Sequence, residues 1–102
     1  MIVLIAVPAA EAPAVARRRP EDGRAAGVNL PPGVRSTYAW GGRVAKSDEA
    51  LLPVKTTGAG CPARGRRARE PHPYEVPQIL ALPVAAGLDP YLDWLKRSVT
   101  PA

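Results

Sequence analysis

The 102-residue sequence predicts an α+β fold in which strands and helices alternate along one domain, residues 1–102. Three observations predict it. A run of branched apolar residues opens the chain, two stretches of strand character flank a Gly-Gly pair, and a periodic helix closes it. The core is expected to be thin, because 13 Pro and 9 Gly occupy a large share of so short a chain.

The first strand is predicted over residues 2–7, IVLIAV, because a continuous β-branched apolar run is typical of a strand buried on both faces. Residues 9–26 follow where a helix is expected. Val15 is their only large aliphatic residue, and Pro20 and Gly23 suit a helix interior poorly. We therefore expect a weak or broken helix there.

A hairpin is predicted in the middle of the chain. Alternation over residues 34–40 favours a strand with one aromatic face that carries Tyr38 and Trp40. Gly41-Gly42 supplies the positive φ angles of a tight turn, and the return strand is predicted over 43–56, with a polar interruption at 47–49. Pro53 has no N–H, so it requires a sheet edge or a bulge at that point.

The last elements are another weak helix, a strand and a short helix. The helix is expected over 58–70 with Pro62 in its first turn, although arginines crowd its apolar face. A strand bracketed by prolines is predicted over 75–84. Asp89 is the expected N-cap of the C-terminal helix, with Pro90 at the first helical position. This order is the ferredoxin-like βαββαβ sandwich with a C-terminal helix.

Composition and charge exclude several classes of protein. Cys61 is the single cysteine, so no disulfide forms within the chain and no CxxC zinc site exists. No apolar run reaches the ~20 residues of a membrane span. The opening MIVLIAVPAA has no basic residue before it, so a signal peptide is not expected. We expect a cytoplasmic protein that has no membrane partner.

Catalysis and nucleic-acid binding find little support in the motifs. No GxSxG nucleophile elbow or phosphate loop occurs and no pair of carboxylates stands out, so we do not expect an enzyme. Net charge is +5, and basic runs lie at 17–19 and 64–70. These runs lack interleaved aromatic residues, so a solvated surface is favoured and no nucleic-acid partner is expected.

Three segments resemble one known family. NLPPGVRSTYAWGGRV, LLPVKTT and HPYEVPQILALPVAAGLDPYLDWL occur in the order and spacing of the CutA divalent-cation tolerance family, over about residues 28–56 and 72–97. The resemblance implies a subunit of a homotrimer similar to the PII signalling proteins. It also implies a role in the tolerance of copper and other divalent metal ions.

The same resemblance implies a metal site at His72, within HPYEVP, with Glu75 the carboxylate of the same motif. A neutral imidazole suits copper and zinc. The alternative is that His72 only caps the local turn through hydrogen bonds. Ile5 and Pro71 stand where some family members carry a cysteine and a second histidine. Cys61 is either a soft copper ligand or a buried inert thiol, and we favour the thiol.

A ligand cleft between subunits is the second implied site, lined by Tyr38, Trp40 and Tyr74 and supplied with a cation by Lys55. The alternative is that these aromatic residues, with Trp94, supply the core, and that Lys55 is solvated. Two functions therefore stay open. One is a trimer that binds copper, another divalent cation or a small ligand. The other is a PII-like structural or signalling trimer that binds a small anion or a protein partner.

The two helical blocks depart most from the family. Segments 9–26 and 58–71 are rich in Ala, Arg, Gly and Pro where the family has large apolar residues. They either form packed helices, or reflect decay or an error of reading frame. Loss of one buried Leu costs about 2–5 kcal/mol, so several such losses would threaten a monomer.

Overall fold

One long strand organises an antiparallel sheet of five strands. The computed structural model describes residues 1–62, 72, 74 and 76–101. The strands are β1 (Ile2–Pro8), β2 (Gly27–Val28), β3 (Val34–Trp40), β4 (Arg43–Lys55) and β5 (Ile79–Leu82). The helices are α1 (Ala12–Glu21) and α2 (Asp89–Ser98), with 3₁₀ turns at Ala9–Glu11 and Gly58–Gly60. The α+β, ferredoxin-like expectation is confirmed.

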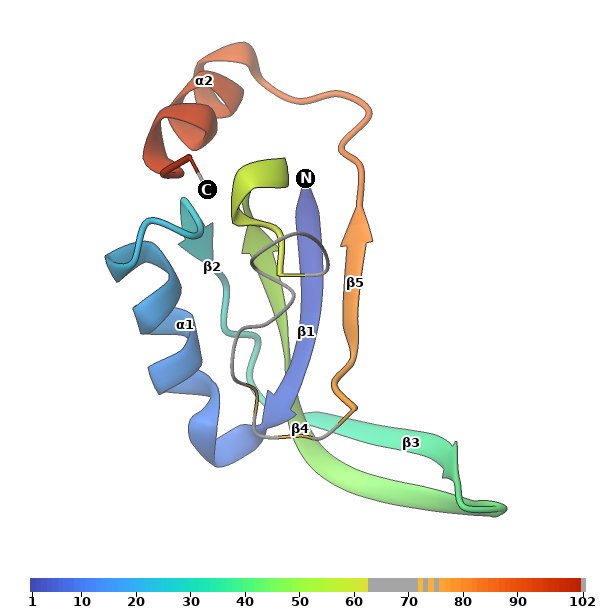
Figure 1. Cartoon of the computed structure of the whole chain (residues 1–102). Helices are drawn as coiled ribbons and strands as arrows, with labels where there is room; N and C mark the ends of the chain where they lie inside the picture. Colours follow the sequence, from blue (N-terminus) through green and yellow to red (C-terminus); the bar gives the residue numbers. More distant parts are fainter. Residues whose placement is uncertain (63–71, 73, 75, 102) are drawn as a thin grey trace.

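Strand β4 takes part in three ladders. Its C-terminal half pairs with β1 in the register Ile2↔Lys55 to Pro8↔Glu49, and its N-terminal half pairs with β3 from Val34↔Glu49 to Trp40↔Arg43. Strand β2 adds to its far end, and β5 lies outside β1, so the order is β2-β4-β1-β5. Figure 1 shows the β3–β4 hairpin extending away from the body of the sheet.

The core lies between one face of the sheet and α1. Val3, Ile5 and Val7 are fully buried on β1, and they lie opposite Val54, Leu52 and Ala50 of β4. Because alternate residues of a strand share a face, all six belong to one layer. Small residues of α1, Ala12 and Ala16, are buried near it. A helix with little apolar bulk therefore packs close to the sheet.

The other face of the sheet is not covered in the same way. Leu4 of β1 and Leu51 of β4 are only half-buried, and Leu80 of β5 is 55% exposed. The expectation that the first strand is buried on both faces is therefore only partly met within one chain. The helix α1 packs against the opposite face, so these leucines retain contact with solvent.

Helix α1 ends in a Schellman motif that begins in the turn containing Pro20. The N–H of Arg24 donates to the carbonyl of Arg19 at 2.9 Å, and the N–H of Gly23 donates to the carbonyl of Pro20 at 3.1 Å. Gly23 has a φ of 68°, as the motif requires. Pro20 lies in the last turn, so the first block of doubtful sequence does form a packed helix, over a shorter span than 9–26.

The central hairpin has the turn that its sequence predicts. Gly41 and Gly42 have φ angles of 57° and 76°, and they connect the paired residues Trp40 and Arg43. Positive φ at both central residues is the requirement of a type I′ turn, which glycine meets without strain. The two-residue loop fixes the register of every pair from Trp40↔Arg43 to Val34↔Glu49.

Pro53 lies where the sheet has a local edge, as its sequence requires. The register between β1 and β4 runs through Leu4↔Pro53 without a bulge. The Pro53 carbonyl accepts the N–H of Asn29 at 3.1 Å, on the side of β2. Since the nitrogen and carbonyl of a strand residue point the same way, the missing donor faces the end of β2, where the ladder stops.

Several boundaries differ from the predicted ones. Strand β5 covers Ile79–Leu82 rather than 75–84, because it pairs only with Ile2 to Ile5 of β1. Helix α2 begins at Asp89 itself, and Leu88 is its N-cap, so Asp89 acts through its charge in the first turn. Of the second doubtful block, Gly58–Gly60 forms a 3₁₀ turn, and residues 63–71 lie outside the described part of the chain.

No helix among the described residues is long and apolar enough to cross a membrane.

A close backbone approach explains Gly60. The hydroxyl of Thr56, which is fully buried, donates to the carbonyl of Arg24 at 2.7 Å. A Cβ at Gly60 would collide with both of these oxygen atoms, whereas a Cβ at Gly58 meets nothing within 4 Å.

We therefore expect Gly60→Ala to lower the free energy of unfolding by about 1–3 kcal/mol through overpacking. Gly58→Ala, in the same 3₁₀ turn, is the matched control and should leave stability nearly unchanged. Urea unfolding at one protein concentration measures both variants. Equal stability of the two would contradict the close approach.

Candidate functional site

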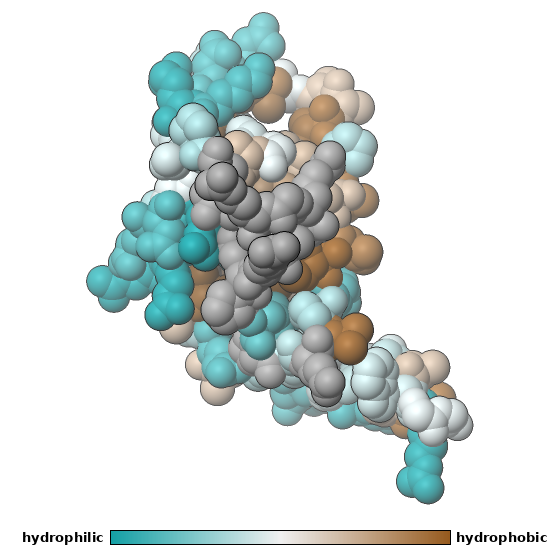
Figure 2. Space-filling view, in the orientation of Figure 1, coloured by the Kyte–Doolittle hydropathy of each residue, from teal (hydrophilic) through white to brown (hydrophobic). Residues whose placement is uncertain are grey.

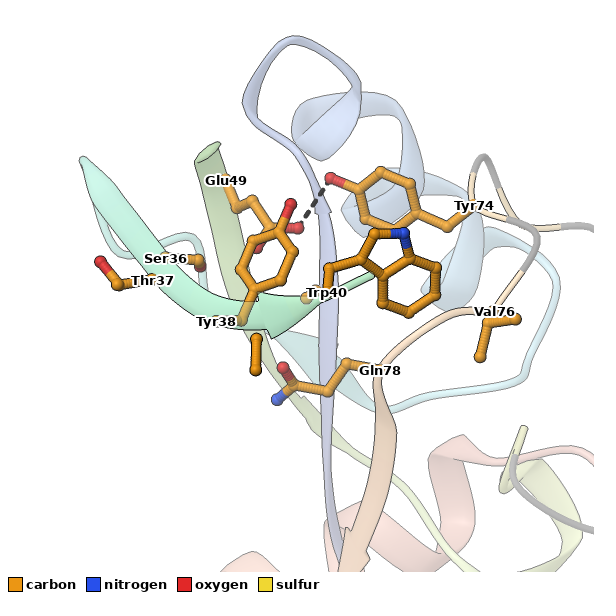
Figure 3. Close-up of a pocket in the computed structure, with 10 residues that line it drawn as sticks. Ser36, Thr37, Tyr38, Trp40, Glu49, Tyr74, Val76 and Gln78 are labelled. Atoms are coloured by element: carbon orange, nitrogen blue, oxygen red, sulfur yellow. Dashed lines mark hydrogen bonds between the residues drawn. The ribbon is translucent and has the colours of Figure 1, made fainter. Parts of the chain in front are cut away.

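A pocket of about 590 Å³ lies on the less covered face of the sheet, where the β3–β4 hairpin leaves the body. Its described lining comes from the end of β1, both strands of the hairpin, and the segment that leads into β5. The lining residues are Ala6, Ser36, Thr37, Tyr38, Ala39, Trp40, Glu49, Tyr74, Val76 and Gln78. Figure 3 shows Tyr38, Trp40, Tyr74 and Gln78 grouped around it.

The register of the hairpin brings the aromatic side chains and a carboxylate to one face. Glu49 lies opposite Val34, and Tyr38 and Trp40 share the face of Val34 by strand alternation. The hydroxyl of Tyr38 forms a hydrogen bond with the hydroxyl of Ser47 at 2.7 Å. Trp40 is 64% exposed, so the pocket is open toward the tip of the hairpin.

Glu49 is the buried acidic group of the pocket, with 9% of its surface exposed. The hydroxyl of Tyr74 donates to its Oε2 at 2.7 Å, as the dashed line in Figure 3 shows. Burial, followed by the hydrogen bond to Glu49, raises the pKa of Tyr74 to about 12. Tyr74 is therefore a neutral hydrogen-bond donor that fixes one carboxylate oxygen at neutral pH.

His72 makes two hydrogen bonds to the backbone. The N–H of Tyr74 donates to Nδ1 at 2.9 Å, so the ring proton lies on Nε2, which donates to the carbonyl of Ala6 at 3.0 Å. The ring lies 5.3 Å from that of Tyr74, with a 37° tilt. Burial lowers the pKa of His72, against a smaller rise caused by the bond to Ala6. The neutral imidazole thus positions Tyr74.

The described residues do not form a metal site within one chain. Both nitrogens of His72 are engaged, and a ligand nitrogen requires a free lone pair. Glu75 lies outside the described residues. Cys61 is fully buried in the core, as expected. Within the described ranges, no three His, Cys, Asp or Glu side chains come together as a ligand group.

Lys55 does not share the pocket with the three aromatic residues. It lies six residues along β4 from Glu49, about 20 Å away at ~3.3 Å per residue. Its Nζ donates to the side-chain oxygen of Asn29. A Cβ at Gly27 would contact both Lys55 and Trp94, and Trp94 lies against Tyr91 at a centroid distance of 5.3 Å. One chain therefore separates the predicted ligand residues into two groups.

Sequence reasoning missed Glu49 and Gln78. Residues 47–49 were interpreted as a polar interruption of the strand. The Gly41-Gly42 turn contained the missing signal, because a two-residue loop forces Glu49 opposite Val34 and onto the aromatic face. No such signal exists for Gln78, whose position depends on the pairing of β5 with β1.

Comparisons with known proteins agree with this fold. The family model of the CutA1 divalent ion tolerance protein matches residues 1–98. The divalent-cation tolerance protein CutA of Thermus thermophilus is 46% identical over 98 residues, which cover 95% of each chain. The chloroplastic protein CutA of Arabidopsis thaliana is 37% identical over 96% of this chain, which spans 54% of that relative.

Solved structures show the same architecture. The CutA1 structure from Thermus thermophilus superposes with a TM-score of 0.87 at 45% identity, over 97% of each chain. The PII-like protein CutA from Nostoc superposes with a TM-score of 0.88 at 32% identity, over 99% of this chain and 98% of that one. The fold is thus the α+β fold of CutA1 and PII-like structures. The chain belongs to the CutA1 divalent ion tolerance family.

The lowered pKa of His72 predicts how stability depends on pH. The folded chain takes up the proton less readily than the unfolded chain, whose histidine pKa is near 6.5. The contribution of His72 is therefore fully present above pH 6.5 and is lost as the pH falls through the lower, folded-state value. Since His72 is the only histidine, the urea concentration at the unfolding midpoint should decrease as the pH is lowered from about 7.5 to 5.5. His72→Gln should make this midpoint less dependent on pH.

Tyr74→Phe should lower the free energy of unfolding by about 1.5 kcal/mol. This is the low end for a hydrogen bond to a charged group, because Tyr74 is only half-buried. Tyr91→Phe is the control, since the Tyr91 hydroxyl bonds to no described side chain. Combining Tyr74→Phe with Glu49→Gln should give less than the sum of the single losses. Strict additivity would show that the charge of Glu49 adds nothing to the 2.7 Å contact with Tyr74.

Proposed function

We propose that this chain forms a cytoplasmic homotrimer that acts in the tolerance of divalent metal ions, copper foremost, and binds a small ligand where subunits meet. The role is binding rather than catalysis. The names of its relatives support the first part, since one is a divalent-cation tolerance protein and another is PII-like.

The observation that carries the proposal is the apolar face of the sheet opposite α1. Leu80 and Leu82 are 55% and 47% exposed on β5, which has a partner on one side only among the described strands. An edge strand with exposed leucines is a surface for another chain. Figure 2 shows hydrophobic side chains along the side where β5 lies, whereas the side of α1 is hydrophilic. A second copy of the chain fits this face.

The pocket has its open side at the same surface. Trp40 and Val76, at its rim, are 64% and 70% exposed. A neighbouring copy packed on the apolar face would narrow the opening and turn the pocket into a cleft between subunits. Lys55, distant within one chain, would enter such a cleft only from a neighbour.

The orientation of His72 favours a second function, a PII-like signalling trimer that binds a ligand or a protein partner without a physiological metal. Both nitrogens of its ring already hold backbone partners. Copper binding at His72, with or without Glu75, would require the ring to give up one of these bonds. Copper titration of the assembled protein separates the two functions.

For the assembly, we expect light scattering on a sizing column to give about three times 10.8 kDa. Leu80→Glu should reduce the mass to that of the monomer, because it would bury a charge in the subunit contact. Ala14→Glu, on the exposed side of α1, carries the same charge and should keep the trimer. A monomeric parent chain, or a Leu80→Glu variant that stays trimeric, would refute the proposed contact.

For the metal, stoichiometric copper binding that His72→Ala abolishes would support the metal-binding function. Isothermal titration calorimetry of the trimer with Cu(II) measures it. Absence of binding by the parent trimer would favour the signalling function, and binding that survives His72→Ala would refute His72 as the copper ligand.

A further inference from the structure

We propose that the pocket binds a small organic cation, an alkylammonium ion with an apolar body, through the carboxylate of Glu49 and the rings of Tyr38, Trp40 and Tyr74. This deepens the ligand-binding role proposed above and rests on it. The described lining all comes from one chain, so the recognition chemistry can be examined separately from the assembly.

The charge of the pocket selects the class of ligand. Glu49 is the single charged side chain among the ten described lining residues. Arg19, which acts electrostatically on His72, does not line the pocket, and Lys55 lies far along β4. The charge of Glu11 acts on Tyr74 in the same direction as that of Glu49. A negatively charged pocket repels a small anion, which was one of the ligands that the sequence analysis allowed, and it attracts a cation.

The geometry of Glu49 leaves room for a donor. Its Oε2 accepts the hydroxyl of Tyr74 at 2.7 Å, while Oε1 accepts no hydrogen bond from the described side chains. The carboxylate is 9% exposed, so its desolvation is already largely complete before a ligand arrives. An ammonium N–H directed at Oε1 would form a charge-assisted hydrogen bond with this carboxylate.

The aromatic residues supply the rest of the recognition. Tyr38, Trp40 and Tyr74 line the pocket together with Glu49, and Figure 3 shows their rings grouped near its carboxylate. Aromatic faces attract cations, and tryptophan does so most strongly. The remaining wall includes Ala6, Ala39 and Val76, which fit an apolar body. A volume of about 590 Å³ lies within the range for small organic ligands and exceeds what one metal ion needs.

Three probes of one shape test the charge. They are 2-phenylethylammonium, the neutral 2-phenylethanol and the anionic 3-phenylpropionate, each titrated into the parent chain by calorimetry. We expect the ammonium ion to bind at least about tenfold more tightly than the alcohol, and the carboxylate to bind least. Equal affinities for the ammonium ion and the alcohol, or preference for the carboxylate, would overturn the proposal.

A pair of variants assigns the charge to Glu49. Glu49→Gln keeps the size of the side chain and an acceptor for Tyr74, and it should remove the preference for ammonium over alcohol. Asp48→Asn removes one negative charge from the preceding residue, which is exposed on the other face of β4. This variant should preserve the preference for ammonium over alcohol. The same loss in both variants would mean general electrostatic attraction and would contradict the site.

Light scattering on each titrated sample separates this proposal from the assembly. If the parent chain is a trimer but shows no preference for the ammonium ion, the proposed ligand class is refuted and the proposed homotrimer is supported. If the particle in solution is not a trimer but prefers the ammonium ion, the proposed homotrimer is refuted and the proposed ligand class is supported. A Glu49→Gln variant that fails to fold does not affect the test, because the three probes on the parent chain decide it.

Discussion

Pairing at Glu49 is the constraint on which the other features depend. This residue lies opposite Pro8 in the ladder with β1 and opposite Val34 in the ladder with β3. Strand β4 therefore changes partner at a single position, and the hairpin departs from the sheet there. The same position holds a carboxylate that is 9% exposed, and Tyr74 reaches it from a distant segment. The change of pairing partner, the departure of the hairpin from the sheet and the pocket thus all result from the pairing of Glu49.

The fold was largely readable from the sequence because its signals are local. The run IVLIAV, the alternation up to Trp40 and the Gly-Gly turn each determine an element within about ten residues. Helix α1 was the hardest to predict, since its contact with the sheet uses Ala12 and Ala16 rather than large side chains. Alanines give little periodic signal, although they permit close packing. The short strand β2 was missed because two residues carry no pattern of their own.

The site was predictable only in part. Tyr38, Trp40 and Tyr74 do share a pocket. Alternation placed the first two on one strand face, but only the resemblance to a family grouped all three as site residues. Lys55 was grouped with them, and the β1–β4 register places it at the opposite end of the strand. Sequence distance does not reveal such a separation, because it depends on tertiary pairing. The orientation of His72 was equally inaccessible, since a carbonyl 66 residues away in sequence accepts its proton.

The end of α1 also limits how this chain can vary. Gly23 accepts the N–H of Thr100 at 2.7 Å through its carbonyl, and a Cβ at position 23 would collide with the Thr100 side chain. Its left-handed φ of 68° already disfavours other residues. The C-terminal cap of α1 and the C-terminal segment are therefore in direct contact, although they are far apart in sequence. Positions 23 and 100 are expected to evolve together, with any larger residue at 23 accompanied by a smaller one at 100.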